Sequence, residues 1–278
     1  MTDPHVYTEE DAKRDLPDLE QWSNKLVGIA QRAAASEEMR LTPGPFRLMC
    51  LAFLSRQVDN VGSLIALHGH RDMTLVARSM LEGMVILMWI SKDPHERAAL
   101  WRDFSFVHDW RMFRRHKREG RPVTEEDWNS VETGLKTVGP KYYSRKSLAC
   151  IRKGLPLPDD PYRWNWIDLK WHEIFKDSDL TDWYERFYAP FADWHHWGAA
   201  SLVQSIRRGD EGIVYSSERA DDTVYALLIS ISSLHVTLQI ADRELHLRIG
   251  PELGQFRQEF EQWHKARGAK WGIPHLLP

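Results

Sequence analysis

Two charged residues, Arg78 and Glu82, interrupt the apolar stretch MTLVARSMLEGMVILMWIS at residues 73–91. Residues four apart share one face of a helix, so these two side chains can pair. A buried charge must be paired or solvated, so the stretch predicts either a silent internal ion pair or a polar pocket. In a pocket, Arg78 would bind an anion or a small polar ligand, and Glu82 would act as a base or as a ligand.

Further polar residues could complete such a pocket. Asp193, His195 and His196 lie together in the sequence DWHHW, and His70 continues the row of Glu82 toward the N-terminus of the same helix. Consecutive helical residues point about 100° apart, so we expect one of the two histidines to face Glu82. The Glu-x-x-His pairs of di-iron bundles are absent, so the sequence assigns no metal and no cofactor, and it leaves open whether the protein is an enzyme.

The string His68-Gly-His70-Arg-Asp72 has the His-x-His-x-Asp order found in metallo-hydrolases, where it follows a strand. Here it joins two predicted helices. We therefore expect a mainly structural role, with Asp72 as the N-cap of the second helix.

Residues 77–104, ARSMLEGMVILMWISKDPHERAALWRDF, resemble a bacterial family of helical domains of unknown function. That family has an Arg-Ser-Leu-Leu-Glu helix, then Asp-Pro and an Arg-containing helix, at positions that are here Arg78, Ser79, Glu82, Asp93, Pro94 and Arg97. Its later Tyr…Ser…His helix has a counterpart in residues 184–198, with Tyr188, Ala192 or Asp193 at the serine position, and His195 or His196. The resemblance implies a helical fold and supplies no chemistry.

Two other functions remain open. Arg102 and His108 have the Arg-x(4–6)-His spacing of HEPN-type ribonucleases, which predicts an endoribonuclease of a toxin or phage-defence type acting as a homodimer. Two further Arg…His pairs have the same spacing by chance, so the spacing alone does not discriminate. The third alternative is a structural or interaction module without catalysis.

Basic residues cluster at the end of one predicted helix and again after it. A nucleic-acid or phosphate patch would use such residues with interleaved tyrosines, whereas a solvated helix end would not. The net charge of −3 favours the solvated helix end, so nucleic acid is not the favoured partner. The residues concerned are Arg111, Arg114, Arg115, Lys117, Arg118, Lys141, Arg145, Lys146, Arg152 and Lys153, with Tyr142 and Tyr143.

The composition is that of a globular protein, with 42% apolar and 28% charged residues. The N-terminus has no basic segment followed by an apolar one, and Cys50 and Cys150 are predicted to be free thiols, so we expect a soluble cytoplasmic protein. We expect no membrane partner. The stretch at residues 73–91 is predicted to be a core helix, because each charge at a bilayer centre costs about 2.5–3.5 kcal/mol.

Apolar periodicity with Pro and Gly punctuation predicts an all-α, single bundle-like domain of about eight helices over residues 16–267. A flexible leader at residues 1–15 and a short tail at 268–278 flank it. We expect a long irregular loop near residues 139–166 and a connector or short hairpin at 209–217. No strand–helix alternation is present, which excludes Rossmann and P-loop folds.

Overall fold

A computed structural model describes residues 9–35, 44–67, 69–195, 206–209, 212–215 and 220–267. The fold is all-α, as predicted, with one short hairpin. The chain forms two compact units. The first unit contains residues 1–92 and 171–278, and the second unit contains residues 93–170.

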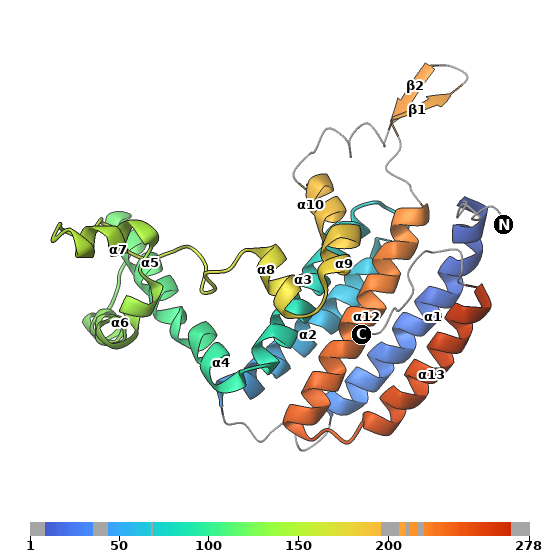
Figure 1. Ribbon diagram of the computed structural model, residues 1–278, viewed down its shortest axis with the longest axis horizontal. Coiled ribbons are helices and arrows are strands. Elements are labelled where there is room, and N and C mark those ends of the chain that lie inside the picture. Colours follow the sequence, from blue (N-terminus) through green and yellow to red (C-terminus); the bar gives the residue numbers. More distant parts are fainter. Residues whose placement is uncertain are drawn as a thin grey trace. The chain divides into compact units, whose positions relative to one another are not determined.

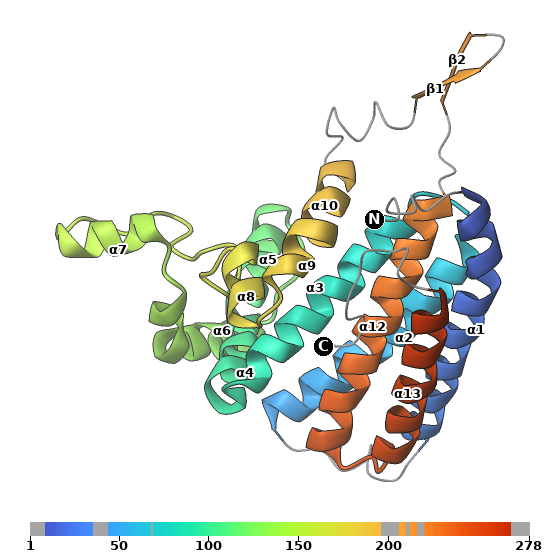
Figure 2. The same ribbon diagram turned by 45° about the vertical axis from the view of Figure 1, so that its right-hand side comes forward.

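Five long helices form the bundle of the first unit: α1 (Glu9–Ala34), α2 (Pro45–Ala66), α3 (Met73–Ser91), α12 (Ala220–Leu245) and α13 (Gly250–Arg267). Helix α12 packs against α1, α2 and α3, and α13 packs against α1 and α12 (Figures 1 and 2). The predicted leader overlaps α1 from Glu9 onward, and its first eight residues lie outside the described part of the chain.

Helix α12 is buried on all sides, because almost every residue from Thr223 to Ala241 is inaccessible to solvent. Two of its buried serines bond back to their own helix: Ser230 Oγ donates to the Ala226 carbonyl at 2.7 Å, and Ser232 Oγ donates to the Leu228 carbonyl at 3.0 Å. Such back-bonding satisfies hydroxyl groups without help from neighbouring helices.

By length and composition alone, α3 and residues 222–245 of α12 could each cross a membrane. In the structure, 56% of the α3 stretch and 89% of the α12 stretch are buried. The core helix of a globular bundle passes the same test.

Short helices complete the first unit: α8 (Trp171–Asp177), α9 (Thr181–Trp183), the π-helical turn η3 (Tyr184–Tyr188) and α10 (Ala189–His195). The last three follow one another without a gap, so the chain is helical from Thr181 to His195 with a π turn inside the run. Pro190 lacks an N–H donor and its ring clashes with the carbonyl four residues earlier, in η3, which accounts for the wider π turn there.

The strands β1 (Ile206–Gly209) and β2 (Gly212–Tyr215) pair antiparallel, with Ile206 opposite Tyr215. This is the short hairpin considered in the sequence, although its first strand begins three residues before position 209.

The second unit contains α4 (Pro94–Asp103), α5 (Ser105–Arg118), α6 (Glu125–Val138), η2 (Gly139–Tyr142) and α7 (Arg145–Arg152). Asp93 caps α4, because its side chain accepts from the Glu96 N–H at 3.3 Å. Apolar residues of α5, α6 and η2 form the core of this unit: Val107, Val131, Leu135 and Tyr142.

The predicted irregular loop at residues 139–166 is partly helical, because η2 and α7 occupy residues 139–142 and 145–152. Ser144 caps α7 by accepting from the Ser147 N–H at 3.1 Å. The expected count of about eight helices is too low. Helix α4 ends and α5 begins around Phe104. After α8 the helix is interrupted at Asp179, which has a φ of 61°.

His235 on α12 supplies a pH test of the core. The ring stacks on Phe256, its Nε2 lies 3.5 Å from the Leu253 carbonyl, and burial lowers its pKa to about 4. The unfolded chain binds a proton near pH 6.5 and the folded chain does not. The contribution of His235 to the free energy of unfolding is therefore fully present above about pH 6.5. This contribution, roughly 3 kcal/mol, is lost as the pH falls from about 6.5 to about 4.

We predict that His235→Gln flattens this part of the pH profile of the free energy of unfolding, measured by urea denaturation. Exposed His108→Gln serves as the control and should leave the profile of the wild-type protein unchanged. An unchanged slope in His235→Gln would contradict the assignment.

Candidate functional site

The ion pair that the spacing predicted is formed on α3. Arg78 Nε donates to Glu82 Oε1 at 3.1 Å. The side chains are 15% and 27% exposed, so the pair is shielded but reaches solvent. The adjacent face of α3 is fully buried through Ala77, Leu81 and Met84, which directs the pair away from the bundle core.

Tyr188, at the end of η3, joins the pair. Arg78 Nη2 donates to Tyr188 Oη at 3.3 Å, and the guanidinium carbon lies 5.0 Å from the centroid of the tyrosine ring. Tyr188 is buried, and burial followed by the charge of Glu82 raises the pKa of its hydroxyl. The hydroxyl therefore stays protonated at neutral pH, accepting from Arg78 and interacting with the Glu82 carboxylate.

An aromatic wall fixes the position of Tyr188. Its ring centroid lies 5.4 Å from that of Trp171, 5.2 Å from Phe175 and 5.3 Å from Tyr184. Phe175 is fully buried and anchors the wall in the first unit. The π turn is part of this construction, and single π turns inside helices are frequent at functional sites.

His70 does not join the cluster. Its Nδ1 accepts from the Asp72 N–H at 3.2 Å, and no hydrogen bond or ion pair connects it with Arg78 or Glu82 among the described residues. The prediction that Asp72 caps α3 through its side chain is wrong. Asp72 already has helical dihedral angles and makes no capping hydrogen bond, because the chain turns from His70 onward.

Sequence reasoning missed the buried neighbour of these residues, Arg71. Its Nε lies 3.0 Å from Asp222 Oδ2, so a buried ion pair joins the start of α3 to α12. The partner lies far along the chain, and no local pattern signals it.

The predicted histidine partners remain partly untested. Asp193 is exposed on α10, and α10 packs against α3, which carries the pair. His195 ends α10, but its side chain and the whole of His196 lie outside the described residues. Among the described residues, no group of three or more His, Cys, Asp or Glu side chains is placed to hold a metal ion.

Arg102 and His108 have separate partners. Arg102 Nη2 donates to Asp103 Oδ1 at 2.6 Å, and Asp103 is buried. The His108 side chain is 75% exposed, with Nδ1 3.7 Å from Asp109. No hydrogen bond or ion pair joins Arg102 to His108 in the described part of the chain, and the ribonuclease site stays a prediction.

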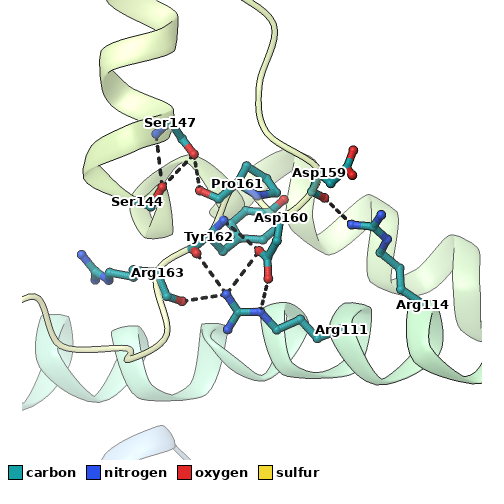
Figure 3. Close-up of polar contacts among 9 residues, drawn as sticks. All are labelled: Arg111, Arg114, Ser144, Ser147, Asp159, Asp160, Pro161, Tyr162 and Arg163. Atoms are coloured by element: carbon teal, nitrogen blue, oxygen red, sulfur yellow. Dashed lines mark hydrogen bonds and ion pairs between the residues drawn. The ribbon is translucent and has the colours of Figure 1, made fainter.

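The first two arginines of the basic run hold a loop of the second unit (Figure 3). Arg111 pairs with both Asp160 oxygens, at 2.8 and 3.2 Å, and donates to the carbonyls of Tyr162 and Arg163, each at 3.0 Å. Arg114 donates to the Asp159 carbonyl. These two side chains are therefore structural.

A cavity of about 380 Å³ lies between this loop and the start of α7. Aromatic and basic side chains predominate in its lining, together with two aspartates that already bond to arginines. The lining residues are Tyr143, Ser144, Arg145, Asp160, Tyr162, Arg163, Trp164 and Asp168.

Fold and site together define an all-α protein with a helical bundle and a shielded Arg–Glu–Tyr cluster. Residues 48–213 match the model of a family described as "Family of unknown function (DUF5677)", which is more than half of the chain. The chain belongs to this family, as the resemblance to a helical family of unknown function predicted. No curated protein and no solved structure matches the chain. The matched range includes Arg78, Glu82 and Tyr188.

We predict that Tyr188→Phe lowers the free energy of unfolding by about 1 kcal/mol, because Arg78 and Glu82 lose a hydroxyl partner. Combining it with Arg78→Met should cost less than the sum of the two single variants, since both disrupt the same interaction. Tyr184→Phe is the control, since its ring lies in the same wall and no hydrogen bond to its hydroxyl occurs among the described residues. Equal losses in the two tyrosine variants would argue against a role for the Tyr188 hydroxyl.

We predict that Arg111→Ala lowers the free energy of local opening of residues 159–163 by roughly 1.5–3 kcal/mol, because the loop loses a charged donor. Hydrogen exchange of the loop amides measures the change. Arg115→Ala, an exposed position on the same helix, should leave their exchange unaltered. Unchanged protection in Arg111→Ala would show that the loop is held by other contacts.

Proposed function

We propose that the cluster of Arg78, Glu82 and Tyr188 binds the anionic group of a small polar ligand. One observation carries the proposal: the shielded guanidinium keeps unused donors. Arg78 bonds to Glu82 through Nε and to Tyr188 through Nη2, so Nη1 has no hydrogen-bond partner among the described residues. A guanidinium has five N–H donors in a planar fork that fits a carboxylate or a phosphate.

The neighbours of Arg78 make it a selective rather than a general anion site. Glu82 holds the guanidinium through Nε and Tyr188 holds it through Nη2, which leaves Nη1 for the ligand. Partial burial strengthens a charged hydrogen bond relative to one in water. The Glu82 carboxylate, which is more exposed than Arg78, would accept from a hydroxyl or amine on the same ligand. Such a ligand would carry an anionic group and a donor.

The proposal gives α10 a supporting role. Because α10 packs against α3, a histidine at position 195 or 196 could supply a further donor to the bound anion. The proposal is limited to binding and assigns no reaction to Glu82. The alternative is a silent ion pair, in which Arg78→Met with Glu82→Leu would leave both fold and cellular phenotype intact.

The test measures the thermal midpoint of the full chain with inorganic phosphate, malonate and AMP as separate probes. A probe present at about 100 times its Kd should stabilise the wild-type protein by about 2.7 kcal/mol. Arg78→Met should abolish this shift. Arg78→Lys should weaken it, because an ammonium group lacks the planar fork.

Arg257→Met is the matched control. Arg257 and Glu261 form the same type of pair on α13, with a contact of 2.9 Å, but both side chains are exposed. This variant should keep the full probe response. No response of the wild-type protein to any of the three probes would contradict the proposal, and so would an equal response in Arg78→Met.

A further inference from the structure

One segment of the second unit has an extreme local charge. Residues 141–158, KYYSRKSLACIRKGLPLP, contain five Lys or Arg residues and no Asp or Glu, although the whole chain has a net charge of −3. This segment includes α7. The potential at its surface is therefore positive, and it differs from that of the chain as a whole.

The same region carries most of the exposed apolar side chains. Seven large hydrophobic residues are exposed in the described part of the chain, and six of them lie between positions 148 and 169. In α7 itself, Ser147 is the buried residue. Leu148 and Ile151 are three apart and share a face that turns to solvent. The six residues are Leu148, Ile151, Leu155, Leu157, Trp164 and Leu169.

Contacts within the second unit hold α7 and Trp164 in place. Ser147 Oγ donates to the Pro161 carbonyl at 2.6 Å, and the Ser144 N–H donates to the same carbonyl at 2.8 Å. Trp164 is 80% exposed, yet its ring centroid lies 4.5 Å from the guanidinium carbon of Arg111. The loop contacts that fix the Arg111 side chain are shown in Figure 3. The exposed apolar surface thus belongs to an ordered structure.

We propose that this surface, made by α7, residues 153–157 and Trp164 and called the α7 surface below, docks on a lipid bilayer that contains anionic phospholipid. Basic residues next to exposed Leu, Ile and Trp are the composition of segments that lie in a membrane interface. The cations meet the phosphates, and the apolar side chains enter the boundary between headgroups and acyl chains. This proposal is independent of the Arg78 site.

Charge and shape disfavour two other occupants. A second copy of the α7 surface would place its four cations, Arg145, Lys146, Arg152 and Lys153, against the same four cations, and such like-charge contacts are costly. Single-stranded RNA would use the cations and stack on Trp164, but it gives aliphatic side chains such as Leu148 and Ile151 no role. A bilayer uses both kinds of residue.

The test is co-sedimentation of the full chain with vesicles of phosphatidylcholine alone and of phosphatidylcholine mixed with phosphatidylglycerol. We expect partition into the anionic vesicles that weakens with added salt. Ile151→Ser should lower the partition coefficient about tenfold, from the loss of a half-exposed isoleucine that enters the interface. Arg152→Gln with Lys153→Gln should lower it about 30-fold.

Two matched controls separate this surface from general effects. Leu48 on α2 is 49% exposed, as is Ile151, so Leu48→Ser removes an equally exposed apolar side chain elsewhere. Arg115→Gln with Arg118→Gln removes two exposed cations from α5. Both controls should keep wild-type partition, and circular dichroism should confirm that every variant is folded.

Several results would overturn the proposal. These are an absence of wild-type binding to anionic vesicles, or equal losses in the α7 variants and their controls. Binding of a single-stranded RNA oligonucleotide by the wild-type protein without vesicle binding would instead assign the α7 surface to nucleic acid. Binding of an acidic polypeptide such as polyglutamate without vesicle binding would assign it to an acidic protein.

Discussion

The burial of α12 is the constraint on which the first unit depends. In a helix enclosed on all sides, polar groups have few partners outside the helix, and in α12 the hydroxyls of Ser230 and Ser232 bond to carbonyls one turn earlier. Its start is tied to that of α3 by the buried Arg71–Asp222 pair, whose two charges would be costly if either were left alone. Because one face of α3 packs against α12, the neighbouring face lies away from the bundle core. That face carries Arg78 and Glu82.

The local part of this arrangement could be predicted from the sequence, because a helical period places residues 78 and 82 together. The distant part could not. Arg78 and Tyr188 are 110 positions apart, and their meeting depends on a π turn that Pro190 favours but does not require. The family resemblance pointed to position 188, but it did not predict the contact of Tyr188 with Arg78. The role of Arg71 could not be predicted either, because it is set by Asp222 on α12, far along the chain.

The basic residues of the second unit illustrate a different limit of sequence reasoning. Arg111 and Arg115 are indistinguishable in a run of cations, yet the first is fixed by Asp160 and two carbonyls and the second is exposed. The partners of Arg111 lie 49 to 52 residues later, in a stretch without periodicity. The net charge of the chain led us to disfavour nucleic acid as a partner, but a total does not show how charge is distributed along the sequence. The structural arginines differ from those of α7 in the exposure of their side chains and in the charge of the segment that carries them.

The order of the two units along the chain has a consequence for biosynthesis. Residues 93–170 form one continuous stretch, whereas the first unit is assembled from segments on both sides of it. During translation the second unit can therefore fold as soon as it leaves the ribosome. The apolar faces of α1, α2 and α3 stay uncovered until α12, which follows the second unit along the chain, has been made. A truncation before α12 would therefore leave the second unit attached to an unfinished bundle.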